Sequence, residues 1–124
     1  MLHRQGRSAV WWTVSGVIGA LGVGLGAFGA HGLKDAIGDP HLLEVWQTGA
    51  RYHLIHTLAL CAVAAHPRPP RWAGGLFVAG ILLFSGSLYT MTLTGSSWLG
   101  AITPLGGMCF IAGWLVLAFA PRTA

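Results

Sequence analysis

The chain has 124 residues, of which 54% are hydrophobic and only 8% are charged. Ordinary soluble domains carry roughly 25% charged residues, so this composition excludes a water-soluble globular protein. The formal net charge of +4 does not indicate nucleic-acid binding, because the arginines flank apolar runs and are not interleaved with aromatic residues on a polar surface.

Two apolar segments in the first half of the chain are predicted to cross a membrane. Residues 9–31 contain no Asp, Glu, Lys or Arg and exceed the ~20 residues that span a ~30 Å hydrocarbon core. Residues 46–65 contain only Arg51, His53 and His56 as charged or imidazole side chains. This second span ends where a run of prolines and arginines follows, because such a run terminates a helix.

The second half of the chain is predicted to contain two more spans. Residues 72–121 include no Asp, Glu, Lys, Arg or His, and a single helix of that length would extend for ~75 Å. The segment must therefore fold back, and the small polar turn at residues 94–97 divides it into spans at 72–93 and 98–120. The sequence thus predicts an all-α polytopic membrane four-helix bundle that forms one membrane domain, residues 1–124.

The distribution of charges predicts the orientation of the bundle. All three acidic residues lie between residues 35 and 44, whereas five of the seven Lys and Arg residues lie in the N-terminus, residues 66–71 and the C-terminus. Short basic segments stay in the cytoplasm, so we expect both termini there (N-in/C-in). A cleaved signal peptide is the main alternative for the first span, but its apolar run is longer than a typical signal core of about 7–15 residues.

Small residues recur along the first span at spacings of four, three, four and three. Such a seam lets another helix backbone approach closely, which matters because apolar side chains gain little by leaving lipid for protein. The alternative is the general glycine enrichment of membrane helices. The regular spacing favours the seam and predicts that the first span is the packing centre of the bundle. The residues of this seam are Ser15, Gly19, Gly22, Gly26 and Gly29.

The side chains that can carry chemistry gather in the outward half of the predicted bundle. At about 100° per residue, His53 and His56 are only about 60° apart on their helix, with Tyr52 on the same side, so they can face one interior pocket. Pro104 is expected to bend the fourth span and to open space beside His56 and Tyr89. The candidate ligand-binding residues are His31, Tyr52, His53, His56, Ser85, Tyr89 and Thr103.

The histidines allow several interpretations. The favoured one is hydrogen bonding between helices, for example from His53 or His56 to Ser85, Tyr89 or Thr103. Metal or haem ligation by His31, His53 and His56 is an alternative, as is a proton or quinone site. No cofactor and no metal ligands are assigned. The serines have no defined His and acidic partner, so no catalytic residue is assigned either.

Arg51 is predicted to project from the other side of the second span. It lies about 200° from His53 around the helix axis, on the side of Glu44 seven residues earlier. A long arginine side chain near a helix end can extend to the membrane interface and meet an acidic residue there. The functional alternative is that Arg51 and Glu44 form an interface or anion contact, for instance with a lipid headgroup.

A set of short segments carries a family resemblance: residues 26–33 (GAFGAHGL), 48–56 (TGARYHLIH), 86–89 (GSLY), 93–95 (LTG) and 102–107 (ITPLGG). Together they resemble the transmembrane protein 256 family, also called domain of unknown function 423, over about residues 15–120. The resemblance implies a small four-span protein of bacterial inner membranes with mitochondrial or other eukaryotic relatives, and no established reaction. The family pattern can carry another polar residue at position 53, which makes His31 and His56 the better site candidates.

Two functional hypotheses follow. The leading one is a non-enzymatic structural or assembly component of the membrane, in contact with the lipid bilayer and with a membrane-protein partner or a second copy of itself, because the chain has a small-residue seam and minimal loops. The alternative is binding of a small ligand, proton, metal or redox cofactor in an outward-facing intramembrane polar pocket. A transporter ranks third, since no inverted repeat is evident.

Overall fold

The computed structural model describes residues 2–122, and every regular element within that range is a helix. The first part of the chain forms a long helix α1 (Leu2–Ala30), a short helix α2 (Gly32–Ala36) and a second long helix α3 (Pro40–Ala65). The side chain of Asp39 caps α3 by accepting a hydrogen bond from the backbone N–H of His41 at 2.9 Å. The predicted all-α class is confirmed for the described residues.

The second part of the chain forms two more helical segments, and we call these and the two long helices α1 and α3 the four rods of the bundle. One consists of α4 (Arg71–Gly80), a π-helical turn η1 (Ile81–Ser85) and α5 (Gly86–Thr94). It ends at Gly95, whose positive φ of 73° is a conformation that glycine adopts without steric cost. The other rod consists of a 3-10 helix η2 (Ser97–Ala101) followed by α6 (Thr103–Ala118).

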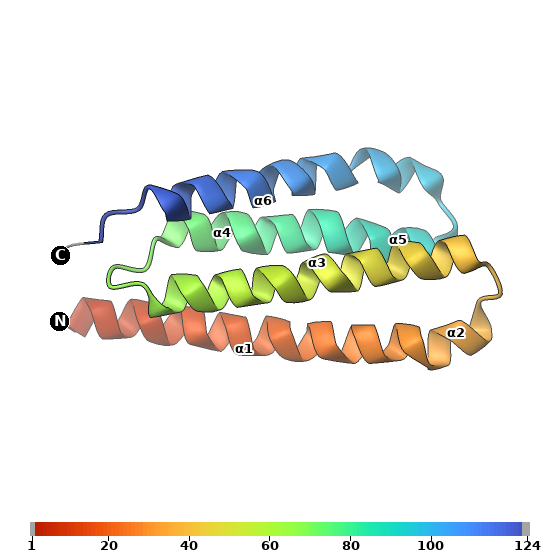
Figure 1. The fold of residues 1–124 in the computed structure, drawn as a ribbon, viewed down its shortest axis with the longest axis horizontal. Coiled ribbons are helices and arrows are strands. Elements are labelled where there is room, and N and C mark those ends of the chain that lie inside the picture. Colours follow the sequence, from red (N-terminus) through yellow and green to blue (C-terminus); the bar gives the residue numbers. More distant parts are fainter. Residues whose placement is uncertain (1, 123–124) are drawn as a thin grey trace.

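The four rods run side by side, and the start of α1 lies at the same end of the bundle as the end of α6 (Figure 1). Helix α1 packs on α3, and α6 packs on α4 and η1, so the α3 rod and the α4–α5 rod occupy the centre. The buried apolar core is drawn from the two central rods and α6: Ala59, Leu60, Val63, Ala73, Phe77, Ile81 and Phe110. The prediction that the first span is the packing centre is therefore wrong, because α1 lies at the edge and packs along one side.

The predicted small-residue seam of α1 is confirmed as its contact with α3. A Cβ atom added at Gly22 would lie 2.8 Å from Leu54 and 3.0 Å from the ring of His53. One added at Gly29 would collide with the indole of Trp46, whose Nε1–H donates a hydrogen bond of 2.8 Å to the Leu25 carbonyl. The seam thus lets α3 approach the α1 backbone closely enough for its side chains to bond to it.

Three stretches of the described chain are long and apolar enough to cross a membrane: Gly6–Ala36, Arg71–Thr94 and Ser97–Ala118. Helix α3 has 26 residues but is not among them. It carries Glu44 and Arg51 together with several polar side chains, which lower its apolar character.

The fourth rod differs from the prediction at its start. Regular α-helix begins at Thr103 and not at residue 98, and Pro104 lies in the first turn of α6. A proline at that position removes no hydrogen bond from the helix, because the first N–H groups have no partner within it. Pro104 therefore starts the helix, and the irregular backbone precedes it in η2.

Candidate functional site

The two histidines of α3 lie in different interfaces, although each is only 4% exposed. The ring of His53 lies between α1 and α5. Its Nε2 atom is 2.9 Å from the backbone carbonyl oxygen of Ile18, and its Nδ1 atom is 2.9 Å from the hydroxyl oxygen of Tyr89. Because a carbonyl oxygen only accepts, Nε2 carries the hydrogen and donates it to Ile18. In the neutral ring, Nδ1 then accepts the hydroxyl hydrogen of Tyr89.

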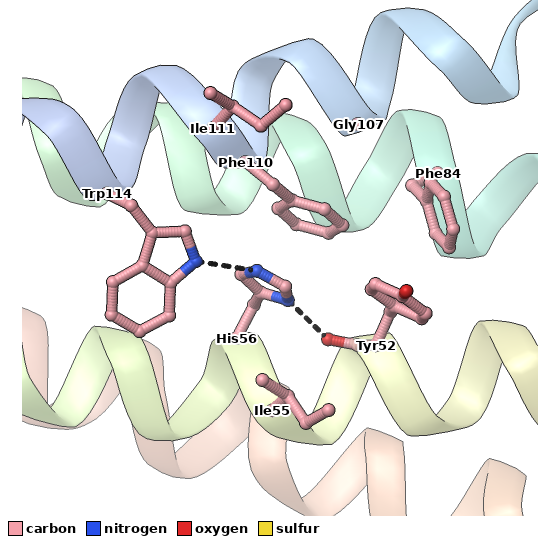
Figure 2. A pocket seen from close by; sticks show the side chains of 8 residues that line it. All are labelled: Tyr52, Ile55, His56, Phe84, Gly107, Phe110, Ile111 and Trp114. Carbon is pink, nitrogen blue, oxygen red and sulfur yellow. Dashed lines mark hydrogen bonds between the residues drawn. The ribbon is translucent and has the colours of Figure 1, made fainter.

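The ring of His56 lies between α3 and α6 and has the opposite tautomer. Its Nδ1–H donates to the carbonyl oxygen of Tyr52, one turn earlier, at 2.8 Å, and its Nε2 accepts from the indole Nε1–H of Trp114 at 3.1 Å (Figure 2). The ring of Phe110 stacks on the imidazole with a centroid distance of 3.6 Å. Both nitrogens of His56 are therefore engaged, and the plane of the ring is fixed.

A pocket of about 420 Å³ lies beside His56, between α3 and α6. Its walls are aromatic and aliphatic, and the Tyr52 ring packs on Phe84 at a centroid distance of 4.6 Å. The lining side chains are partly open to the outside of the bundle, since Ile55 is 45% exposed and Ile111 is 63% exposed. The eight lining residues are Tyr52, Ile55, His56, Phe84, Gly107, Phe110, Ile111 and Trp114 (Figure 2).

The hydroxyl group of Tyr52 is the polar group of the pocket that makes no hydrogen bond within the described chain. The other polar groups of the lining, the imidazole of His56 and the indole N–H of Trp114, bond to each other. The pocket thus offers a bound molecule a mostly apolar surface and one hydroxyl that can donate or accept.

The remaining candidate residues are distributed over several places. The Ser85 hydroxyl donates to the Gly49 carbonyl at 2.7 Å, and the Thr103 hydroxyl lies 2.7 Å from that of Ser87. His31 is exposed at the junction of α1 and α2. No group of three His, Cys, Asp or Glu residues able to hold a metal ion occurs within the described residues.

The structure thus distributes the predicted set over several helix interfaces and one exposed end. His53 and Tyr89 meet as the hydrogen-bonding interpretation expects, and His56 and Tyr52 share the pocket, which Tyr89 does not line. Sequence reasoning placed His56 among the candidates, and its partner across the interface is the indole of Trp114. It missed the pocket walls, because ordinary apolar residues in an apolar span carry no distinguishing signal; these are Ile55, Phe84, Gly107, Phe110 and Ile111.

The two residues predicted as an anion contact lie on the exposed surface of α3. Arg51 directly precedes Tyr52 and is one helical turn before Ile55, both of which line the pocket. Glu44 is two turns nearer to the start of α3, and no ion pair joins it to Arg51 within the part of the chain that the structure describes.

Comparison with known proteins gives a consistent result. Residues 25–107 match the family model described as "Protein of unknown function (DUF423)". The UPF0382 membrane protein YwdK of Bacillus subtilis is 50% identical over 114 residues, which are 86% of this chain and 92% of that protein. A UPF0382 membrane protein of Schizosaccharomyces pombe is 43% identical over 86% of this chain and 96% of its own length.

A further UPF0382 membrane protein, from Staphylococcus aureus strain USA300, is 47% identical over 84% of this chain and 91% of its own length. No solved structure matches the chain. The resemblance that the short sequence segments predict is confirmed, and the chain belongs to the DUF423 family, a family of membrane proteins without an assigned activity.

Proposed function

We propose that this protein is a non-enzymatic membrane protein that binds a hydrophobic molecule from the bilayer in the pocket between α3 and α6. The observation that carries the proposal is the pocket itself, which is lined by aromatic rings and open toward the side of the bundle (Figure 2). Its volume of about 420 Å³ falls within the range of about 300–1,000 Å³ that is typical of small-molecule sites.

The walls of the pocket are held in place before any ligand arrives. The imidazole of His56 is fixed by two hydrogen bonds and by stacking on Phe110, and the indole of Trp114 is held by its bond to His56. A site whose side chains are already ordered loses little conformational entropy on binding. This order supports a binding role for the rings in addition to their role in packing.

The hydrogen bonds of the histidines argue against the other chemistries considered for this site. Each of the four ring nitrogens of His53 and His56 has a partner within the protein. Coordination of a metal requires a free nitrogen lone pair, and a proton relay requires a partner that exchanges protons. The lone pairs here accept from Tyr89 and Trp114, so metal coordination would first have to break a bond between helices. The partners of His56, a backbone carbonyl and an indole N–H, do not exchange protons with it.

A pocket-filling variant tests the proposal. A Cβ atom at Gly107 would meet no atom within 4 Å, so the side chain of Gly107→Leu begins in open space and occupies the pocket that Gly107 lines. Gly75→Leu is the matched control, because Gly75 is exposed on α4 and its Cβ position is equally open. We expect native mass spectrometry of gently solubilised protein to detect a bound apolar molecule in wild type and Gly75→Leu but not in Gly107→Leu. Equal occupancy in all three proteins would contradict the proposal.

Self-association is the second candidate function, and the outer face of α1 favours it. The seam that suggested an external partner is occupied by α3 within the same chain. A second set of small residues, Gly16, Ala20 and Gly24, is exposed on α1 at spacings of four, and the two glycines have open space beside them. Small residues at this spacing allow membrane helices to approach closely.

The test of self-association is the mass of the protein in detergent. If α1 is the contact, Gly16→Leu and Gly24→Leu shift an oligomer toward the monomer, whereas Gly75→Leu on α4 does not. A monomeric wild-type protein at all concentrations would refute this candidate.

For the topology, we propose that α3 is a fourth span of a single membrane domain and that both termini face the cytoplasm, in the plasma membrane. Packing of α3 between α1 and the α4–α5 rod supports this assignment, since the rings of His53 and His56 bond to α1, α5 and α6. The basic segments at the start of α1, between α3 and α4, and after α6 lie at one end of the bundle (Figure 1).

Labelling of single cysteines in intact cells tests the topology, in a background without Cys61 and Cys109. A cysteine at Gly38, between α2 and α3, should react with an impermeant maleimide from outside, and one at Pro67 should react only after lysis. The reverse pattern would overturn the orientation. Reaction of both positions from the same side would overturn the crossing by α3.

A further inference from the structure

We infer that the pocket between α3 and α6 is the chain-binding part of a site for an anionic phospholipid, and that Arg51 binds the phosphate of its headgroup. This inference rests on the proposed binding function of the pocket and names the class of ligand. The juxtaposition that carries it is a charged side chain placed at the rim of an apolar pocket inside a membrane-crossing region.

The position of Arg51 follows from the geometry of α3. The helix is continuous from Pro40 to Ala65, so residues four apart in it are neighbours on its surface. Arg51 is therefore adjacent to Ile55, and it directly precedes Tyr52; both of these residues line the pocket. Side chains of an α-helix lean toward its N-terminus, so the long side chain of Arg51 can extend from the pocket toward the outer end of the bundle.

The charge of Arg51 is isolated within the bundle. No other Asp, Glu, Lys or Arg occurs between residues 45 and 67 or between residues 72 and 121. Arg51 is exposed at the surface of α3 and forms no ion pair within the described chain. A cation at the depth of a membrane span is unfavourable unless an anion or water meets it. A lipid phosphate is the anion available on the lipid-facing surface.

The chemistry of the rim fits a phosphate ester. A guanidinium presents paired N–H donors that match two oxygens of one phosphate, and this arrangement is more specific than a point charge. The hydroxyl of Tyr52, which has no partner within the described residues, lies on the neighbouring residue and can donate to the phosphate or to an ester oxygen. The rim therefore offers the guanidinium of Arg51 and the hydroxyl of Tyr52 as donors.

The apolar part of the pocket fits an acyl chain that continues inward from this headgroup. From the end marked by Tyr52 and Phe84, the pocket runs along α3 and α6 to Trp114 (Figure 2). That direction leads from the outer half of α3 toward its C-terminal half, which is the direction that a chain takes from the outer leaflet to the bilayer centre. Ile55 and Ile111 flank the path and remain partly exposed.

The experiment compares lipids that differ only in the headgroup. Wild-type protein is equilibrated with a mixture of phosphatidylglycerol and phosphatidylcholine of identical acyl chains, and the retained lipid is identified by native mass spectrometry. We expect a preference of about tenfold for phosphatidylglycerol, the size of one good charge-assisted contact. Arg51→Gln should remove the preference while a lipid still binds, and Arg51→Lys should restore part of it.

Three controls separate the possible failures. Arg7→Gln removes an exposed cation at the other end of the bundle and should leave the preference unchanged. Gly107→Leu should abolish retention of both lipids. Excess inorganic phosphate should not displace the bound phospholipid, because the acyl chain contributes to binding.

The outcomes distinguish this inference from the proposal on which it rests. If Arg51→Gln keeps the preference, or if Arg7→Gln loses it equally, the headgroup assignment is wrong while the pocket remains a site for apolar molecules. Displacement by inorganic phosphate would likewise overturn the assignment of a phospholipid. If wild-type protein retains neither lipid and Gly107→Leu changes nothing, both the headgroup assignment and the proposed binding function are wrong.

Discussion

The adjacent glycines Gly106 and Gly107 give the sharpest test of how the α6 rod packs. A Cβ atom added at Gly106 would lie 2.7 Å from the Cβ and 2.8 Å from the Cα of Phe84, and closer still to the Phe84 backbone nitrogen. One added at Gly107 would meet nothing within 4 Å. The same Gly→Ala substitution can therefore be made at two positions in one turn of α6. At Gly106 the added methyl group meets a steric conflict, and at Gly107 it does not.

The expected magnitude combines two effects of opposite sign. Alanine is favoured over glycine inside a helix by roughly 0.5–1 kcal/mol. Overpacking against a backbone that cannot rotate away costs about 1–3 kcal/mol, and at Gly106 the neighbouring atoms are mostly backbone. We expect Gly106→Ala to lower the free energy of unfolding by about 1–2 kcal/mol and Gly107→Ala to leave it unchanged or to raise it by up to about 1 kcal/mol.

The measurement is reversible unfolding in mixed micelles by steric trapping or by denaturing detergent, followed by circular dichroism. A separation of about 2 kcal/mol between the two variants corresponds to roughly a 30-fold difference in the unfolding equilibrium constant. Equal stabilities would show that α6 does not approach η1 as closely as the structure has it. A more stable Gly106→Ala protein would refute the packing argument outright.

Three further predictions concern the histidine networks. Trp114→Phe leaves the buried Nε2 of His56 without a donor and should cost about 1–3 kcal/mol in unfolding free energy, whereas Trp12→Phe, at a side chain that is 49% exposed, should cost little. Tyr89→Phe removes the hydroxyl donor to His53 and should cost about 0.6 kcal/mol, the average for bonds between membrane helices; a value near zero in a double-mutant cycle with His53→Ala would contradict this bond. Treatment with a strong chelator should leave the unfolding midpoint unchanged, because the imidazole nitrogens have partners within the chain; a lowered midpoint would refute the hydrogen-bonding interpretation.

The features of the fold that depend on composition and spacing could be predicted from the sequence. Apolar runs indicate the rods, because a membrane helix needs a stretch of fixed length. The prolines that follow α3 cannot continue a helix, and the glycine that follows α5 adopts the left-handed conformation that ends one. Both helix ends could therefore be predicted from the residue types. The small-residue seam could also be predicted, since close contact between membrane helices needs small residues at regular intervals.

The arrangement of the rods could not be predicted in the same way. A seam shows that a helix has a close neighbour but not how many other neighbours it has, and α1 has its close contact along one side. The separation of His53 from His56 has a related cause. An angle of about 60° between two side chains is compatible with one shared pocket, yet it is also wide enough for each ring to enter a different gap between helices. The neighbouring helices determine which gap each ring enters, and these helices come from distant parts of the chain.

The π-helical turn η1 is the feature that connects the fold to the pocket. The N–H of Gly86 reaches back to the carbonyl of Ile81, five residues earlier, so one extra residue is accommodated in that turn and the face of the rod rotates. At this turn Ser85 bonds to the α3 backbone, the Phe84 backbone contacts α6 at Gly106, and the Phe84 ring closes one end of the pocket. A regular helix would bring a different set of side chains to α3 and α6. Because a period of 3.6 residues contains no sign of such a turn, a pocket that depends on it is invisible to sequence periodicity.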